Sequence, residues 1–388
     1  MITRMPLIRL SVCLLLAGSL HADSFPQALF DALRSAEENQ NIVFSPYGVT
    51  AVLAMAGAGA RGDTAEQIAR VLQLGDSPDT IVQQFAALQK TVEGASSPNV
   101  TLQNANALFP QQDYAFQPDY LTYVKRPFNG TVVPVDYAQQ FERSCGIINQ
   151  WVSEKTGRRI RELIIPGTLN AQTRLTLVNA IYFKAAWREP FDKHQTRSFP
   201  FTLPSGEVKD VPFMNKTAHF SYLETEPAQI LDIPYIGNNL VLTLLLPKPG
   251  HTIGQALAPL FEARVPKLEQ TYVKAAFPKF TFNAQFNLSA TLLKLGMPDA
   301  FDEKADFSGM DGTRELRLSD VLHQAFIEVD EVGTTAAAAT ETMIALGSPP
   351  TQKTFLANRP FAFAIRVRDS GTILFLGILN DPAPLEHF

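Results

Sequence analysis

The stretch from Asp330 to Pro350, DEVGTTAAAATETMIALGSPP, is the part of the chain that decides its fold. Helix propensity alone predicts a helix over Thr334–Thr342, because alanine is the best helix former. This segment nevertheless lacks an apolar stripe with which a helix could pack. It directly follows a predicted strand over Leu322–Val329, and it ends in Gly-Ser-Pro-Pro, which is typical of a loop. We therefore interpret it as an exposed loop.

A run of small, uncharged side chains suits a second purpose, which is to enter a packed β-sheet between two existing strands. Side chains alternate between the two faces of a strand. One face then carries Thr334, Ala336, Ala338, Thr340 and Thr342, and the other carries Thr335, Ala337, Ala339 and Glu341. The only charge of this run is on the second face, as insertion with that face turned outward would require.

The N-terminal third of the chain predicts helices. Phe25–Ala36 has apolar residues on one face at helical spacing, and Ser45-Pro46 is an N-cap with proline in the first helical turn. The helix that follows, Val49–Ala56, is apolar nearly all round and is therefore expected to be buried. Asp63-Thr64 is expected to cap a further helix over Ala65–Leu74.

The middle and C-terminal parts predict strands. Leu175–Phe183 carries little charge and suggests a central strand that is covered on both faces. Phe361–Val367 and Ile373–Leu379 flank Asp369-Ser370-Gly371, which indicates a hairpin. Because no linker, repeat or charge block divides the chain, we expect one large α+β domain over residues 23–388.

The composition is that of a globular protein, with 46% hydrophobic and 18% charged residues among 388 and a net charge of −5. Such a mild acidic excess argues against a nucleic-acid partner. Residues 1–22 are predicted to be a signal peptide, because Arg4 and Arg9 precede an apolar run of Leu10–Leu20 that is too short to span a bilayer. The expected location is extracellular or periplasmic, without a membrane partner. Removal of Cys13 would leave Cys145 alone, so no intramolecular disulfide is expected.

Enzyme signatures are weak. Gly57–Gly62 matches G-x-G-x-x-G, but a dinucleotide site needs a strand before this motif, and here the preceding segment is predicted to be a helix. We therefore favour a helix-to-helix turn over a nucleotide-dependent oxidoreductase. The common hydrolase motifs are absent, and the histidines lack metal-ligand spacing, so no catalytic residue, metal or cofactor is predicted. A basic cluster is interpreted as solvated surface, with a polyanion site as the alternative: Lys155, Arg158, Arg159 and Arg161.

Several segments, in order, resemble the serpin family over nearly the whole chain. They are Asn41–Pro46, Val178–Trp187, Phe280–Phe282 with Leu295–Met297, Ala305–Gly309, Glu331–Thr340, Phe355–Phe361 and Phe375–Pro382. The resemblance implies the serpin fold, with three mostly antiparallel sheets, about eight or nine helices and an exposed reactive loop at about 331–353. It also implies that the loop hinge comprises Glu331, Gly333, Thr334, Thr335, Ala336, Ala337, Ala338, Ala339 and Thr340.

By the same resemblance, Ser45, Asn179, Trp187 and His323 control the opening of the main sheet. Ser45, Asn179 and His323 match a polar cluster beneath the sheet, which is equally interpretable as a satisfied core network. Gly48 stands where many family members have a second serine, so this network is expected to be thinner here.

The function implied is that of a monomeric suicide inhibitor. A serine endopeptidase, or a cysteine one, attacks the loop and forms a covalent acyl complex, and the loop then inserts as a new strand. The alternative is a non-inhibitory serpin acting as carrier or chaperone. We rank Leu346-Gly347 first as the scissile bond and Gly347-Ser348 second, because leucine fills an apolar specificity pocket. This favours elastase-, chymotrypsin- or subtilisin-like targets.

Overall fold

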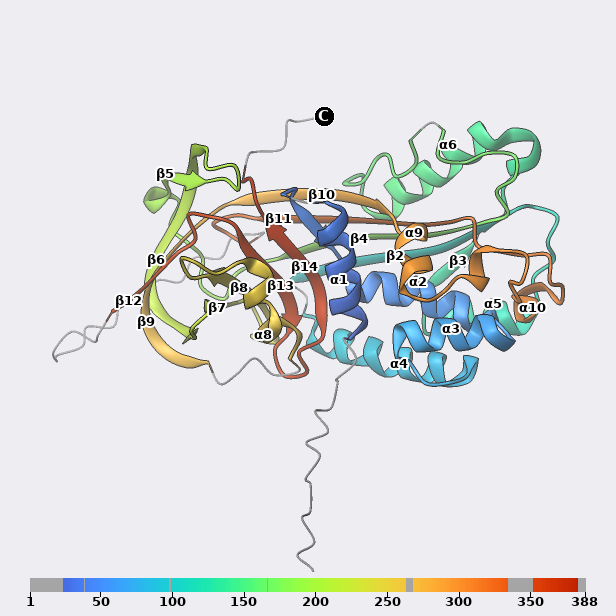
Figure 1. The fold of residues 1–388 in the computed structure, drawn as a ribbon, viewed down its shortest axis with the longest axis horizontal. Coiled ribbons are helices and arrows are strands. Elements are labelled where there is room, and N and C mark those ends of the chain that lie inside the picture. Colours follow the sequence, from blue (N-terminus) through green and yellow to red (C-terminus); the bar gives the residue numbers. More distant parts are fainter. Residues whose placement is uncertain are drawn as a thin grey trace, which may run out of the picture.

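The computed structural model describes residues 24–37, 39–97, 99–165, 167–262, 268–333 and 352–382. Within these ranges the chain forms α-helices, two short 3₁₀-helices and two hydrogen-bonded β-sheets (Figure 1). The helices are α1 (Phe25–Ala36), α2 (Pro46–Gly59), α3 (Gly62–Leu72), α4 (Pro78–Ala95), α5 (Pro118–Lys125), α6 (Tyr137–Lys155), η1 (Lys193–Gln195), α7 (Ile253–Ala256), α8 (Ala258–Phe261), α9 (Ser289–Leu295), η2 (Asp299–Phe301) and α10 (Ser308–Asp311).

The five-stranded sheet has the order β10-β11-β4-β2-β3. Its strands are β2 (Val100–Pro110), β3 (Gly130–Val132), β4 (Leu175–Ala185), β10 (Phe280–Asn287) and β11 (Asp320–Val329). β4 is central and almost wholly buried, as its apolar sequence predicts. β4 and β11 run parallel to each other, whereas β2 and β10 are antiparallel to their neighbours β4 and β11.

The nine-stranded sheet has the order β1-β14-β13-β8-β7-β6-β9-β12, with β5 paired to β6. Its strands are β1 (Ile42–Phe44), β5 (Arg197–Thr202), β6 (Val208–Glu224), β7 (Ala228–Pro234), β8 (Leu240–Pro247), β9 (Glu269–Pro278), β12 (Lys353–Leu356), β13 (Phe361–Val367) and β14 (Ile373–Leu379). The α+β class is confirmed. The described residues form two sheets rather than the expected three because β6, 17 residues long, joins three strands in succession. It pairs with β5 over residues 208–213, with β9 over 213–222 and with β7 over 221–224.

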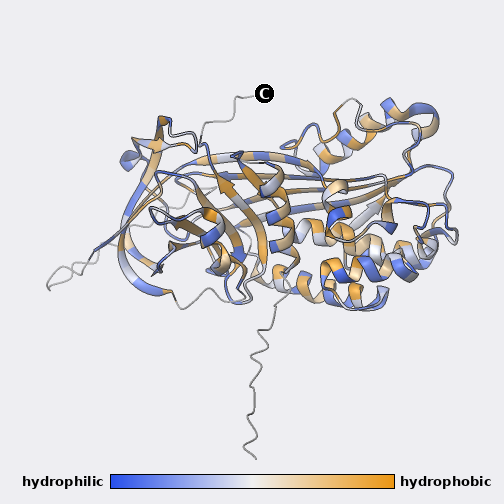
Figure 2. Cartoon of the chain, viewed as in Figure 1, coloured by the Kyte–Doolittle hydropathy of each residue, from blue (hydrophilic) through white to orange (hydrophobic). Residues whose placement is uncertain are grey.

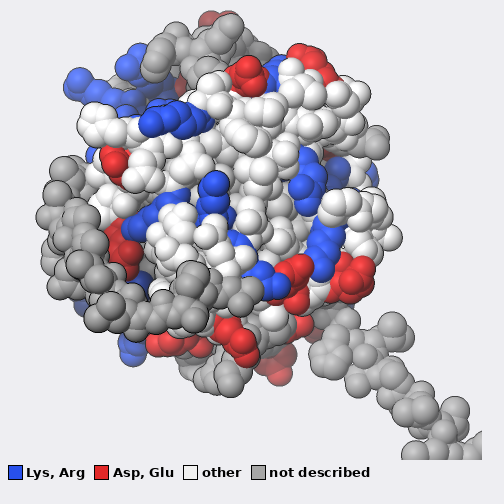
Figure 3. Space-filling model, turned by 90° about the vertical axis from the view of Figure 1, so that its left-hand side faces the viewer, with Lys and Arg blue, Asp and Glu red and all other residues white. Residues whose placement is uncertain are grey.

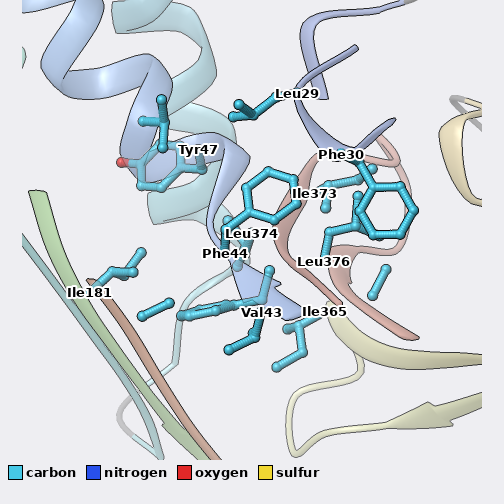
Figure 4. Close-up of a cluster of buried hydrophobic side chains, with 14 of the residues drawn as sticks. Leu29, Phe30, Val43, Phe44, Tyr47, Ile181, Ile365, Ile373, Leu374 and Leu376 are labelled. Carbon is cyan, nitrogen blue, oxygen red and sulfur yellow. The ribbon is translucent and has the colours of Figure 1, made fainter. Parts of the chain in front are cut away.

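α2 lies between the two sheets, and the face that each sheet turns towards α2 is hydrophobic. All of its residues are buried, and it packs against β4 of one sheet and β14 of the other. Figure 4 shows this core, where Phe44 of β1 and Leu374 of β14 lie near Ile181 of β4. By contrast, the outer helices α3 and α4 alternate hydrophobic and hydrophilic residues (Figure 2).

α6 covers the opposite face of the five-stranded sheet. Ile148 and Val152 of α6 belong to a second hydrophobic cluster with Val178 of β4 and Leu322 of β11. Both faces of the β4–β11 pair are therefore packed, one against α2 and the other against α6 and the segment after it. The expectation that an inserted strand would turn one face outward concerns residues outside the described ranges and stays a prediction.

The glycine-rich junction Gly57–Gly62 connects α2 to α3, so it follows a helix and not a strand. This bears out the interpretation as a helix-to-helix turn. The expected cap at Asp63-Thr64 is wrong, because α3 already begins at Gly62. The Thr64 hydroxyl instead accepts a hydrogen bond of 3.0 Å from the backbone N–H of Asp306.

Candidate functional site: the β4–β11 junction

The junction between β4 and β11 lies at the centre of the five-stranded sheet. The pair extends over eight residues, from Asp320 opposite Thr176 to Ile327 opposite Phe183. Parallel pairing is slightly less stable per residue than antiparallel pairing. This junction is therefore the one interface in the middle of the sheet that a further strand could improve.

A polar cluster lies beneath the junction and joins Ser45, Asn179 and His323. The Ser45 backbone N–H donates to His323 Nε2 at 2.9 Å, so the proton of this imidazole is on Nδ1, which donates to Asn179 Oδ1 at 2.7 Å. Burial lowers the pKa of His323 to about 3, and the ring is therefore neutral at physiological pH. Ser45 also caps α2, since its hydroxyl accepts from the Gly48 N–H at 2.9 Å.

Two asparagines that the sequence analysis missed complete this cluster. Asn179 Nδ2 donates to the side-chain oxygens of Asn104 and Asn106 of β2, at 2.7 Å each. Their spacing of two residues was the available signal, because within a strand it places both amides on one face. The network is therefore extended by β2.

Packing against Asn179 explains why position 48 is a glycine in this cluster. A Cβ at this position would overlap the Oδ1 atom of Asn179. Glycine thus leaves room for the amide that links β4 to β11 and β2.

Trp187 closes the junction at the far end of β4. Its indole Nε1 donates to the Asp330 carbonyl at 2.8 Å, and its backbone N–H donates to the Val332 carbonyl at 3.2 Å. The ring is buried and stacks on Tyr235 with centroids 4.5 Å apart. These contacts hold the chain that leaves β11 against the end of β4.

Gly333 is the last residue of the predicted hinge that the structure describes. Its φ of +78° suits glycine, and a Cβ would overlap the backbone of Ala185 and Trp187. An isolated antiparallel bridge pairs Gly333 with Asp330, so the chain has already turned back on β11.

Glu331 is buried at this turn. Burial alone would raise the pKa of its carboxyl, but hydrogen bonds from its own backbone and from Thr196, together with Lys279, keep that pKa below its usual value. The Thr196 hydroxyl donates at 2.8 Å and Lys279 Nζ lies at 3.4 Å. Glu331 thus anchors the start of the loop to the nine-stranded sheet and to the chain after β9.

The other predicted loop residues lie outside the described residues. They are Thr334, Thr335, Ala336, Ala337, Ala338, Ala339 and Thr340 of the hinge and Leu346, Gly347 and Ser348 of the scissile region. Their roles stay predictions.

The four residues of the basic cluster, Lys155, Arg158, Arg159 and Arg161, are all exposed, as expected of a solvated surface. Arg159 also lies over the ring of Tyr182 of β4, 5.8 Å from its centroid. The Cys145 thiol is free and half-buried on α6, where burial raises its pKa.

Within the described ranges, no helix is long and apolar enough to cross a membrane. The same part of the chain contains no cluster of three or more histidine, cysteine or acidic side chains suited to a metal ion.

A family model described as serpin (serine protease inhibitor) matches residues 21–382. The chain is a serpin. An uncharacterized serpin-like protein of Thermococcus kodakarensis is 37% identical to it over 366 residues, which cover 93% of this chain and 84% of that protein. The leukocyte elastase inhibitor of Bos taurus is 34% identical over 370 residues, which cover 92% and 97%.

Solved serpins also share the fold of this serpin. Uncleaved ovalbumin superposes with a TM-score of 0.83 at 26% identity, covering 92% of this chain and 98% of ovalbumin. Human thyroxine-binding globulin, solved in complex with thyroxine, gives a TM-score of 0.82 at 29% identity, covering 93% of this chain and 97% of the globulin. The serpin fold predicted from the sequence is thereby confirmed, and membership in a family of protease inhibitors makes a protease the general class of partner.

Proposed function

We propose that this serpin is secreted and inhibits endopeptidases by inserting its cleaved loop between β4 and β11. The observation that carries the proposal is the parallel pairing of these two strands in the middle of the sheet. A strand that turns back from the end of β11 is antiparallel to β11 and, because β4 is parallel to β11, also antiparallel to β4. Insertion thus replaces one parallel interface by two antiparallel ones, which gains hydrogen bonds and improves their geometry.

The bridge between Asp330 and Gly333 supports a specific register for the inserted strand. Extended one residue at a time, it pairs Thr334 with Val329, Ala336 with Ile327, Ala338 with Ala325, Thr340 with His323 and Thr342 with Val321. Directly opposed residues of an antiparallel pair share a face. The threonines and alanines of this set would therefore face the main core with α2, where only small side chains fit. Thr340 would separate His323 from Asn179 and offer its hydroxyl in place of their hydrogen bond.

The same register places Glu341 opposite Leu322, on the face that α6 covers. A carboxylate there would displace apolar contacts unless α6 and its following segment move. Insertion in this serpin therefore includes a rearrangement over that face.

In the proposed mechanism, the target protease attacks the loop as a substrate and forms an acyl-enzyme. The freed loop end then inserts, carries the covalently attached protease from the Trp187 end of β4 towards its first residue, Leu175, and distorts its active site before water releases it. Loop insertion of this kind is the known example of strand addition and of release of stored strain.

Target preference rests on the loop rather than on the surface beside it. The end of the molecule that carries β5, β6 and β12 shows basic and acidic side chains side by side (Figure 3). Several are paired there, as Lys216 is with Glu189 and Lys353 with Glu224. Such a surface offers no field of a single sign, so we assign selection to Leu346 and to elastase-, chymotrypsin- or subtilisin-like enzymes.

The alternative function is that of a carrier, as the thyroxine complex of a structural relative illustrates. A carrier does not need an insertable hinge, and a charged or proline-bearing hinge would favour it. Thr334–Thr340 contains only threonine and alanine, which favours inhibition.

The test combines a protease panel with two hinge variants of the full secreted chain. Thr334→Arg puts a charge on the core face, where an unpaired buried charge costs several kcal/mol (about 3–5), so insertion should become slower than deacylation and the inhibitor should become a substrate. Thr335→Arg, one residue on and on the opposite face near Glu328, should still form a complex that survives a denaturing gel. Full inhibition by Thr334→Arg would refute insertion.

Leu346→Arg tests the scissile bond. The variant should form covalent complexes with trypsin-like enzymes in place of elastase-like ones, because a specificity pocket selects by complementarity. Mass spectrometry of the released C-terminal peptide identifies the bond. Retained elastase inhibition with cleavage elsewhere would show that another residue occupies the pocket.

A further inference from the structure

A pocket of 460 Å³ lies at the end of the five-stranded sheet that is opposite Trp187. Arg174, which lines it, directly precedes β4, and Gln111, which also lines it, directly follows β2. The two are joined by a 2.8 Å hydrogen bond from the Gln111 N–H to the Arg174 carbonyl. The pocket also adjoins the start of β11, because the Arg174 N–H donates to the Ser319 hydroxyl at 2.9 Å.

The guanidinium of Arg174 is the only basic group of the pocket lining and forms no ion pair with the carboxylates of the described chain. Its Nη1 donates to the carbonyls of Ala171 and Thr173, at 3.2 and 3.1 Å. The Tyr114 hydroxyl shares this space: burial raises the pKa of Tyr114, and the positive charge of Arg174 opposes that rise.

Three carboxylates also line the pocket, and two of them are already engaged. Asp311 accepts from the N–H and hydroxyl of Thr313 at 2.8 Å each, and Asp113 accepts from Gln111 Nε2 at 3.3 Å. Glu315 is the third. A negative ligand of Arg174 therefore meets three competing carboxylates, two of which already accept hydrogen bonds from Thr313 or Gln111.

The length of the loop indicates that its cleaved end, once inserted, reaches this pocket. In the register set by Asp330 and Gly333, Met343 stands opposite Asp320, the first residue of β11. Ile344, Ala345 and Leu346 then extend beyond the strands, between Arg174 and Ser319. Thirteen residues from Thr334 to Leu346 span roughly 43 Å when extended, so the new chain end arrives where the pocket opens.

We propose that this pocket receives the end of the inserted loop and that Arg174 binds the carboxylate formed at Leu346. The inference rests on the proposed function. Attack on the Leu346–Gly347 peptide bond releases the Gly347 amine, and water then hydrolyses the acyl-enzyme ester to leave a carboxylate on Leu346. A guanidinium with adjacent hydroxyl and amide donors is a fitting partner for such a carboxylate. Arg174 thus fastens the far end of the strand whose near end is anchored at Glu331.

The experiment uses the intact chain and two peptides of residues 334–346, one ending in the Leu346 carboxylate and the other in a carboxamide. Each is annealed into the sheet, and its dissociation is followed by a fluorescent label at its N-terminus. The wild type should retain the carboxylate peptide about threefold longer than the carboxamide, which corresponds to a partly exposed ion pair. Arg174→Gln should abolish this difference, Arg174→Lys should keep most of it, and Glu315→Gln should widen it.

The outcomes separate the two proposals. Equal retention of both peptides by the wild type, or an undiminished preference in Arg174→Gln, would overturn the role of Arg174 and leave insertion intact. Failure of both peptides to anneal would contradict insertion itself, and the role of Arg174 with it.

Discussion

The two sheets of this serpin both contain polar side chains in their interiors, but of different kinds. In the nine-stranded sheet, Asp232 of β7, Thr243 of β8 and Arg366 of β13 form a buried charged cluster. The Thr243 hydroxyl donates to Asp232 Oδ1 at 2.5 Å and accepts from Arg366 Nε at 2.9 Å. In the five-stranded sheet the corresponding cluster, built on Asn179 and His323, is neutral.

This difference indicates which of the two sheets can separate a pair of its strands at the lower cost. Separating Asp232 from Arg366 would strand a charge in the core, where it costs several kcal/mol (about 3–5). Separating Asn179 from His323 breaks a neutral hydrogen bond worth about 1 kcal/mol net, and another hydroxyl can replace it. Buried charged groups thus hold the strands of the nine-stranded sheet together. The strands of the five-stranded sheet, which is proposed to accept a new strand, are joined by neutral groups that can exchange hydrogen-bond partners.

The largest expected effect is that of cleavage between Met343 and Ser348. About ten new ladder hydrogen bonds at ~1 kcal/mol each would rival the whole stability of many proteins, ~5–15 kcal/mol. The thermal midpoint should therefore rise by tens of degrees, as calorimetry of intact and cleaved protein can show. Cleaved Thr334→Arg should show a much smaller rise. An unchanged or lower midpoint for the cleaved wild type would leave a non-inhibitory serpin.

The second effect concerns the buried charged cluster of Asp232, Thr243 and Arg366. Asp232→Ala should lower the free energy of unfolding by about 3–5 kcal/mol, because Arg366 stays buried without its partner. The paired replacement Asp232→Leu with Arg366→Met should restore most of that loss. Urea titration of the three proteins measures both. If the single and paired variants were equally unstable, the charges would not be what fixes these strands.

The smallest effect concerns pH and the neutral cluster. Because burial lowers the pKa of His323 to about 3, the unfolded chain takes up a proton below pH 6.5 that the folded chain refuses. This contribution to stability is complete above pH 6.5 and is lost as the pH falls towards 3, by about 3 kcal/mol between pH 6.5 and 4. The ¹⁵N chemical shifts of the His323 ring should stay those of the neutral Nδ1–H form down to pH 4. A transition near pH 6 would contradict the neutral cluster.

Local patterns in the sequence predicted much of the fold. The helix Phe25–Ala36 and the hairpin strands Phe361–Val367 and Ile373–Leu379 agree with the structure to the residue, since each depends on nearby residues alone. The cap at Asp63-Thr64 was wrong because α3 begins at Gly62, and the Thr64 hydroxyl instead accepts from a tertiary partner, the backbone N–H of Asp306. No local pattern reveals a partner 242 residues away.

The candidate site was predicted in part. Resemblance to the family pointed to Ser45, Asn179 and His323, and the structure brings these three together. Asn104 and Asn106 were missed because they reach Asn179 only through the pairing of β2 with β4, which depends on contacts more than 70 residues apart. The cover of α6 over Leu322 was missed for the same reason.

The bridge between Asp330 and Gly333 has a kinetic consequence. The slow step in forming a hairpin is the first residue pair, because closing the turn costs chain entropy before any hydrogen bond between the strands has formed. Here that nucleus is complete while the loop is still intact, fixed by Trp187 and by glycine in a conformation that other residues resist. In the insertion proposed above, the hairpin nucleus therefore exists before cleavage. After cleavage, the loop only has to extend its pairing residue by residue, and the rate of this extension competes with the rate of deacylation.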